Sequence, residues 1–185
     1  MLRPYYPVSR FTRKHYRSQA TMLRLLGGAV LAGVIGVALL ATNSAHAAQP
    51  MLKFDGGIGA DPLRAGAATN DVLGVPPGGR PWVIERLTAN IDFNSLIHVD
   101  GRGLLLAGGP AIGRNGGQSV RARLLCNDGV TTTSSHQTAL VPLAANGDFS
   151  FNEALDPPVP ANCGNPILLI VNTGGAWFAA GIPKD

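Results

Sequence analysis

The sequence predicts an all-β domain, an antiparallel two-sheet β-sandwich of about seven short strands over residues 81–185. Three observations favour this fold class. Apolar and polar residues alternate with a period of two from Pro81 onward, which is typical of strands with one buried face. Clusters of Gly, Asn, Asp and Pro separate the alternating segments. No stretch after residue 80 has the periodicity of an amphipathic helix.

Each strand is predicted from its own local pattern. In 97–105, Ile97, Val99 and Leu105 are expected to face inward, and residues 131–135 are expected to form a loop or an edge. Asn146-Gly147 is a strong hairpin signal between two strands. The segment 166–171 is apolar on both faces, so we expect it in the middle of a sheet. The predicted strands are 82–93, 97–105, 119–126, 136–143, 149–151, 166–171 and 176–182.

The first 47 residues are predicted to be a secretory signal peptide rather than part of the fold. An apolar run over 25–41 follows Arg24 and leads to Ala45-His46-Ala47, a small-residue motif with cleavage expected between Ala47 and Ala48. Retention of the run as a membrane anchor is the alternative, since its length is close to the lower limit for crossing a bilayer. The basic region before it is long, so the true start is either Met1 or Met22.

Between the signal and the strands, residues 48–80 are rich in Gly and Pro. We expect an irregular leader there, lying on the domain or partly disordered.

The two cysteines, Cys126 and Cys163, are predicted to form a disulfide, because an exported protein enters an oxidising compartment. The alternatives are a metal-binding pair or a catalytic thiol. Two cysteines without a CxxC spacing are a poor metal site.

The alternation of Val120, Ala122, Leu124 and Cys126, the later run from Asn146 to Phe149, and Cys163 resemble features of secreted prealbumin-like and pollen Ole-type β-sandwiches. The resemblance covers residues 120–169. It implies a sandwich of the immunoglobulin-like or prealbumin-like kind, and it implies no catalytic residue.

Loss of the signal changes the charge of the protein. Six of the fifteen basic residues would leave with it, so nine would remain against all eleven acidic residues, a net charge of −2. Binding of nucleic acid through a basic face is therefore not expected.

Two sets of polar residues are candidate binding sites. His98, Asp100 and Arg102 share one face of a predicted strand and could bind an acidic ligand or position a proton donor; the alternative is a solvated outer face. Arg121 and Arg123 share another outward face. With Arg102 and Arg114 they could form a basic patch; the alternative is ordinary surface charge paired with Glu85 or Asp92.

Other residues give weaker indications of chemistry. Trp82 and Trp177 could stack on sugars, although core packing is the simpler role. The adjacency of Ser134, Ser135 and His136 does not by itself define a catalytic triad. No spacing of His, Cys or acidic residues predicts a metal site, and no cofactor is expected.

The sequence therefore predicts a secreted or periplasmic, non-enzymatic structural or binding module. Its partner is an unknown extracellular or periplasmic ligand or protein, met by loops that include 108–117 and 127–135. The alternative is a small secreted enzyme or ligand carrier that uses the row of His98, Asp100 and Arg102.

Overall fold

The computed structural model describes residues 51–184, apart from 63, 66–67, 128 and 130–132. These residues contain no helix, so the prediction of an all-β domain is confirmed. It follows that none of the described segments is a helix long and apolar enough to cross a membrane. The predicted signal peptide, its cleavage between Ala47 and Ala48, and the alternative start at Met22 lie outside the described residues.

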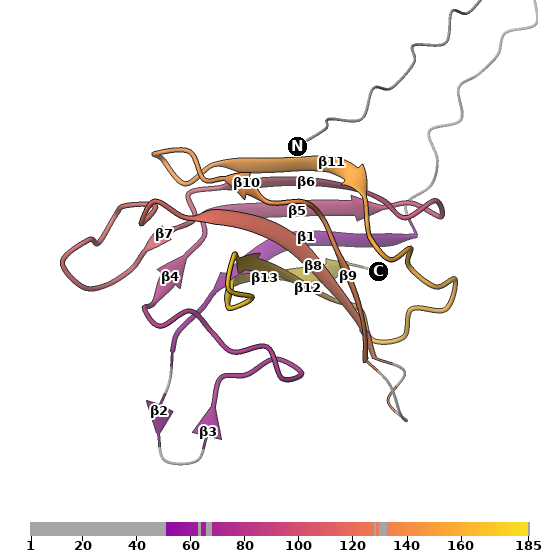
Figure 1. Ribbon diagram of the computed structural model, residues 1–185, viewed down its shortest axis with the longest axis horizontal. Coiled ribbons are helices and arrows are strands. Elements are labelled where there is room, and N and C mark those ends of the chain that lie inside the picture. The colour runs from indigo at the N-terminus through magenta and orange to yellow at the C-terminus, as the bar shows by residue number, and fades with distance from the viewer. Residues whose placement is uncertain (1–50, 63, 66–67, 128, 130–132, 185) are drawn as a thin grey trace, which may run out of the picture. The chain divides into compact units, whose positions relative to one another are not determined.

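Most strands belong to one antiparallel sheet (Figure 1). Its strands are β1 (Leu52–Gly59), β5 (Arg86–Ile91), β6 (Leu96–Arg102), β8 (Ser119–Asn127), β9 (Thr133–Gln137), β10 (Val141–Pro142), β11 (Phe149–Ala154), β12 (Ile167–Asn172) and β13 (Trp177–Lys184). They pair in the order β10-β8-β12-β13-β1-β5-β6-β11, and β9 also pairs with β8. Two small ribbons stand apart, formed by β2 (Arg64–Ala65) with β3 (Ala68–Thr69) and by β4 (Trp82–Val83) with β7 (Leu105–Leu106).

The sheet curls until its two ends meet. The end strands β10 and β11 are joined by the predicted hairpin, in which Gly147 N donates to Ala144 O over 2.8 Å. Beyond β11, Gln137 and Asp156 exchange two backbone hydrogen bonds of 2.8 and 2.9 Å. The hydrogen bonds thus join the large strands in one curled sheet, and a division into two packed sheets remains a prediction.

The prediction of an irregular leader over 48–80 is wrong for residues 52–59. They form β1, which pairs with β5 on one side and β13 on the other. Glycines in this segment mark close packing rather than a loop. A Cβ on Gly57 would lie 2.9 Å from side-chain atoms of both Ile84 and Leu87, and one on Gly59 would overlap the Trp82 carbonyl. β1 is therefore part of the sheet, which extends upstream of residue 81.

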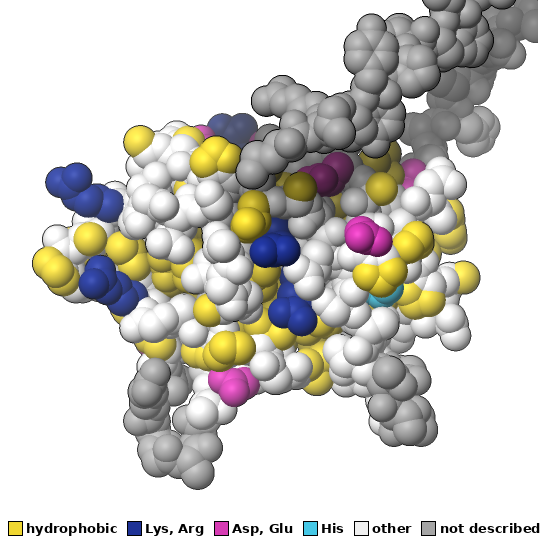
Figure 2. Space-filling model, viewed as in Figure 1, with side chains coloured by type: hydrophobic (Ala, Val, Ile, Leu, Met, Phe, Trp, Pro, Cys, Tyr) yellow, Lys and Arg dark blue, Asp and Glu magenta, His cyan; other side chains and the backbone are white. Residues whose placement is uncertain are grey.

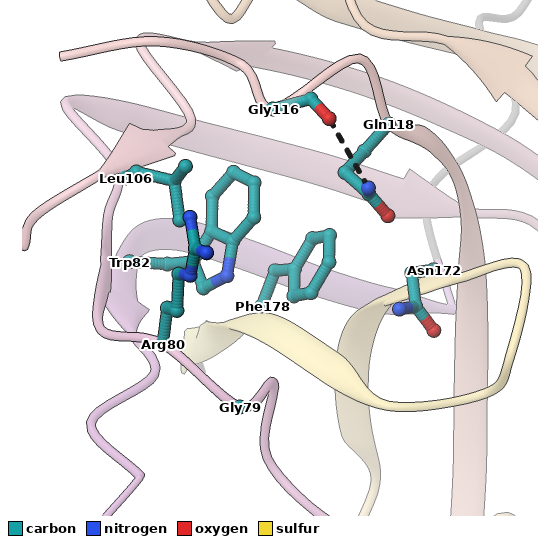
Figure 3. Close-up of a pocket in the computed structure, with 8 residues that line it drawn as sticks. All are labelled: Gly79, Arg80, Trp82, Leu106, Gly116, Gln118, Asn172 and Phe178. Carbon is teal, nitrogen blue, oxygen red and sulfur yellow. Dashed lines mark hydrogen bonds between the residues drawn. The ribbon is translucent and has the colours of Figure 1, made fainter. Parts of the chain in front are cut away.

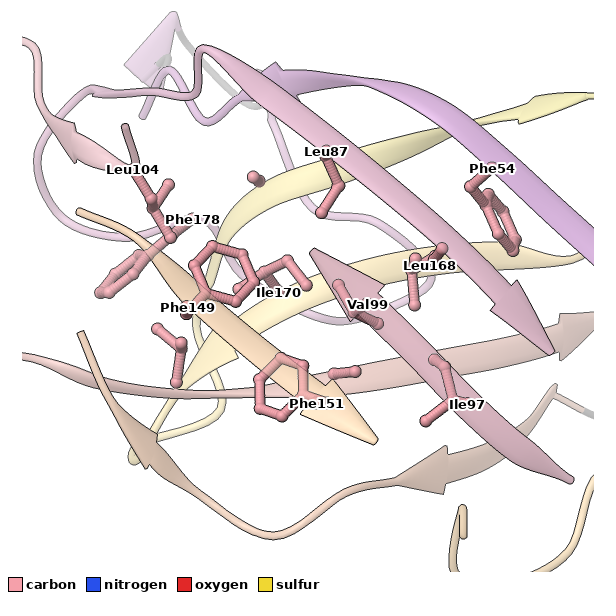
Figure 4. Packing of buried hydrophobic residues seen from close by; sticks show 14 of the residues in the cluster. Phe54, Leu87, Ile97, Val99, Leu104, Phe149, Phe151, Leu168, Ile170 and Phe178 are labelled. Carbon is pink, nitrogen blue, oxygen red and sulfur yellow. The ribbon is translucent and has the colours of Figure 1, made fainter. Parts of the chain in front are cut away.

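The inner face of the curled sheet encloses the main core (Figure 4). Its alternating residues meet across the strands: Ala89 of β5 lies opposite Val99 of β6, and Val99 lies opposite Phe151 of β11. All three are buried, as the period-two pattern predicts.

Two apolar residues of the predicted strands do not face the core. Phe93 is 73% exposed, because the alternation ends at Asp92, whose Oδ1 accepts backbone hydrogen bonds from Asn94 and Leu96 and closes a turn. Leu105 is only partly buried, while Leu104 and Leu106 are buried. The left-handed backbone of the preceding Gly103 (φ 64°) ends β6 and changes which leucines point inward.

Strand β12 is buried on both faces, which confirms its predicted central position. Leu168 and Ile170 belong to the main core. Leu169 and Val171 belong to a second apolar cluster on the outer side of the sheet. That cluster includes Ala60 and Val75, with Val72 packed against it, so these residues cover the outer face of the sheet at this strand.

The predicted disulfide between Cys126 and Cys163 is present, with the two Cα atoms 4.9 Å apart. It joins the end of β8 to the segment that leads into β12. The next residue strengthens this connection, since Asn127 N donates to Gly164 O over 2.9 Å. A disulfide is consistent with an oxidising compartment.

Truncation of β12 tests its burial on both faces. We expect Leu168→Ala and Leu169→Ala each to lower the free energy of unfolding by about 2–5 kcal/mol, because both side chains are fully buried. Urea denaturation measures the loss. Leu96→Ala, at a side chain that is 44% exposed, is the control and should cost less than about 1 kcal/mol. A Leu169 variant as stable as this control would contradict the covered outer face.

Candidate functional site

The row of His98, Asp100 and Arg102 lies on the outward face of β6, as predicted. Arg102 Nε donates to Asp100 Oδ1 over 3.1 Å, and the two side chains are 56% and 40% exposed. His98 lies opposite Asn90 of β5 and Asn152 of β11. The row is therefore part of a polar, solvent-facing sheet surface.

A shallow depression of about 260 Å³ touches part of this row. Asp100 and Arg102 line it together with Asp148 and Ser150, but His98 does not. The Asp100–Arg102 ion pair therefore lies at the depression, whereas His98, the only imidazole of the row, lies outside it. This arrangement favours the solvated outer face over a proton-transfer site.

The four arginines predicted as a basic patch lie on different elements. Arg121 and Arg123 are neighbours on the outward face of β8, whereas Arg102 is on β6, which is not adjacent to β8 in the sheet. Arg114 is exposed in the Gly-rich segment before β8. Among the described residues, neither Arg121 nor Arg123 forms an ion pair with Glu85 or Asp92, since Arg102–Asp100 is the only salt bridge there.

A concave surface with both apolar and polar walls lies where β8 begins and β12 ends. It is a cavity of about 460 Å³ (Figure 3). Its walls come from the segment before β4, from β4 and β7, from the residues before β8, and from the facing ends of β12 and β13. They are Gly79, Arg80, Trp82, Leu106, Gly116, Gln118, Asn172 and Phe178.

Two stacked aromatic rings form the apolar part of this cavity. The centroids of Trp82 and Phe178 are 3.9 Å apart and their planes differ by 17°. Both residues are at least 95% buried, at 5% and 3% exposure, so they also pack in the core. Leu106 lies beside the Trp82 ring in Figure 3. Trp177, the other candidate for stacking, belongs to the outer apolar cluster and does not line the cavity.

Polar groups from three segments complete the walls. Gln118 Nε2 donates to Gly116 O over 3.3 Å, which leaves the carboxamide oxygen as an acceptor. Asn172 Oδ1 accepts from Ala176 N over 2.9 Å, and its amide nitrogen donates to no other described residue. The exposed Arg80 adds a positive charge. The cavity can therefore offer hydrogen-bond donors, the Gln118 oxygen as an acceptor, and one cation beside an apolar surface.

Sequence reasoning anticipated only part of this cavity. Gly116 comes from the 108–117 loop that was expected to meet a partner, and Trp82 was a candidate for stacking. Phe178, Gln118 and Asn172 were missed. A signal was present in the clustering of Gly and Asn at 172–175, but nothing in the sequence places this turn beside Trp82.

A buried histidine forms a second polar constellation. His136 is 2% exposed; its Nδ1 donates to Pro157 O over 2.7 Å and its Nε2 accepts from Ser134 Oγ over 2.8 Å. A carbonyl oxygen can only accept, and this assigns the proton to Nδ1. Ser134, His136 and the Pro157 carbonyl thus form a hydrogen-bonded chain. None of these residues lines a described cavity. The arrangement fastens the segment after β11 to β9.

Comparison with known proteins adds no relatives. No family model matches the chain, and neither the curated proteins nor the solved structures contain a match. The resemblance to prealbumin-like and pollen Ole-type sandwiches gains no support from these searches. Within the described part of the chain, no group of three or more His, Cys, Asp or Glu side chains is placed to hold a metal ion.

The structural role of His136 can be tested by substitution. We expect His136→Ala to lower the free energy of unfolding by about 1–3 kcal/mol, because a buried side chain is removed and two partly buried hydrogen bonds are lost. Ser134→Ala should have a smaller effect, since only one of these bonds is lost. Urea denaturation and proteolysis of the 156–160 segment report the change. A His136 variant of unchanged stability that lost an ester-hydrolysing activity would assign the pair a chemical role instead.

Proposed function

We propose that this protein is an exported, non-enzymatic binding module, and that its ligand occupies the cavity between β4, β12 and β13. One observation carries the proposal: a cavity of about 460 Å³ combines a stacked aromatic pair with polar side chains from separate segments. Ligand sites are typically concave and largely apolar, with a few polar groups that fix orientation.

The walls define the chemistry of the ligand. Arg80 and the amides of Gln118 and Asn172 supply mainly hydrogen-bond donors. The edges of Trp82 and Phe178 supply apolar contact. The ligand we propose is a small molecule with an apolar face and with hydroxyl or carboxylate oxygens, such as a sugar or a sugar acid.

Export belongs to the same proposal. The disulfide between Cys126 and Cys163 supports an oxidising compartment, and the predicted signal over 1–47 supplies the route. The packing of the curled sheet as two layers around one core is the finer form of the fold that this proposal includes.

An enzyme or carrier that uses His98, Asp100 and Arg102 is the second candidate. The depression beside Asp100 and Arg102 favours it, and the exposure of the row on a sheet surface counts against it. His98→Ala tests this candidate, because it removes the only imidazole of the row.

Ligand binding can be followed through the fluorescence of Trp82. The chain has two tryptophans, so Trp177→Phe leaves Trp82 as the only indole reporter. We expect one or more members of a panel of monosaccharides and uronic acids to shift its emission and to raise the midpoint of thermal unfolding. Gln118→Ala combined with Arg80→Ala should weaken binding about tenfold or more, because two polar contacts are lost.

A matched control removes polar groups elsewhere. Asn90→Ala and Asn152→Ala, on the outward face of β5 and β11, should leave binding unchanged. Native mass spectrometry of protein recovered from outside the cytoplasm extends the search beyond the panel. The proposal would be abandoned if that protein carried no small molecule and no panel member changed the Trp82 signal.

The mass of exported protein tests the predicted processing. We expect intact-mass measurement to give a chain that starts at Ala48, two mass units lighter than the reduced form because of one disulfide. Reduction and alkylation provide the reference mass. Recovery of the full chain, still carrying residues 1–47, would instead show that the apolar run is a membrane anchor.

A further inference from the structure

Two arginines on the outward face of β8 form a site that is separate from the cavity. Arg121 and Arg123 alternate along one strand, so their Cα atoms are about 7 Å apart and their side chains leave the same face. Figure 2 shows two Lys or Arg side chains next to each other over the middle of β8, the strand at the front of Figure 1. Neither arginine lines the cavity of the proposed function.

Their described hydrogen-bond partners are neutral. Arg121 Nη1 donates to Gln137 Oε1 over 3.2 Å, and Arg123 Nε donates to Ser135 Oγ over 2.9 Å. The described residues provide neither arginine with a carboxylate within salt-bridge distance. Two like charges are thus held side by side without a compensating anion, which is unfavourable unless a negative group binds there.

Arg121 carries the clearest sign of a missing partner. Its Nε is buried and has no hydrogen-bond partner, and it is the one such side-chain atom among the described residues. Buried N–H groups in folded proteins are normally satisfied by protein, water or an ion. Both arginines are only partly exposed, so an anion bound to them would be screened less than at a fully solvated site.

We infer that Arg121 and Arg123 together bind a tetrahedral oxyanion, a phosphate or sulfate group. A guanidinium presents its N–H donors in a planar fork that matches one pair of oxygens. A planar carboxylate offers only one such pair. A tetrahedral group has oxygens that point in different directions, so it can bond to two guanidiniums that approach from neighbouring positions of one strand.

The surroundings of the pair restrict how the anion is held. Ser135 and Gln137 of β9 orient the two guanidiniums through the bonds above. Gly175, in the turn between β12 and β13, is close to the other side: a Cβ there would lie 4.0 Å from Arg123 Nη1. The site thus has a polar border on β9 and a border without a side chain at Gly175.

Thermal unfolding in different salts of equal ionic strength tests the inference. At about 10 mM phosphate or sulfate we expect the midpoint to rise by about 5 °C relative to chloride, as for a dissociation constant of about 1 mM. Acetate should give a clearly smaller rise. Glycerol phosphate distinguishes a free ion from an esterified group. A rise in the midpoint equal to that with phosphate indicates that the site accepts a phosphate group on a larger molecule. No rise indicates that the site accepts only the free ion.

Matched variants separate the site from general salt effects, because phosphate and sulfate stabilise many proteins. Arg121→Gln with Arg123→Gln should abolish the additional rise. Arg86→Gln with Arg102→Gln, an equal change of charge on β5 and β6, should preserve it. Arg121→Lys with Arg123→Lys retains the charge but loses the planar set of guanidinium donors, and should reduce the rise in the midpoint. An equal rise in all these variants would overturn the inference.

A second readout does not depend on how well the variants fold. In the unmodified protein, the NMR signals of the arginine Nε–H groups should move on titration with inorganic phosphate for Arg121 and Arg123, and remain in place for Arg86. Uniform small shifts of every exposed arginine, with no saturation, would show only nonspecific ion binding and would also overturn the inference.

Discussion

The burial of β12 on both of its faces is the constraint on which the rest of the structure depends. A strand that is apolar on both faces cannot have one face in water without a large loss of hydrophobic stabilisation. Its inner residues, Leu168 and Ile170, are covered because the sheet curls around them. Its outer residues, Leu169 and Val171, need a separate cover, and Ala60, Val72 and Val75 contribute to it. These three residues lie between β1 and β4, so the described part of that segment contributes to the apolar packing despite its scarcity of regular structure.

The same constraint connects this cover to the cavity. Trp177 and Phe178 follow each other at the start of β13 and belong to opposite faces of the sheet. Trp177 lies in the outer cluster, where its Nε1 donates to Asn70 O over 3.1 Å. Phe178 stacks on Trp82 at the cavity.

Gly78 N donates to Trp177 O over 2.8 Å, and a Cβ on Gly78 would lie 2.7 Å from the Phe178 ring. One segment thus covers the outer face and then enters the cavity wall at Gly79 and Arg80.

The sequence is sufficient for the strands whose pattern is local. The alternation in 97–102 and 119–126, the hairpin at Asn146-Gly147 and the central position of 166–171 need only the period of the side chains and the chemistry of the turn. β1 could not be recognised in this way. Its glycines are the usual signature of a loop, and they are required here because Leu87 and the backbone of Trp82 approach too closely for a side chain. That requirement comes from residues that are distant in the sequence, Leu87 for Gly57 and Trp82 for Gly59.

The candidate sites show even more clearly that a local sequence pattern does not reveal which residues become neighbours in the fold. Two rows of charged residues have the same pattern in the sequence, with alternate positions on one strand. On β6 the acid and the base are in the same row, and Arg102 pairs with Asp100. On β8 both charges are positive, and the neighbouring strand presents Ser135 and Gln137, which accept hydrogen bonds but carry no charge. Which strand lies beside β8, and in which register, decides whether its arginines are neutralised. That is a property of the sheet, so the difference between a solvated surface and an anion site emerges only once the strands are paired.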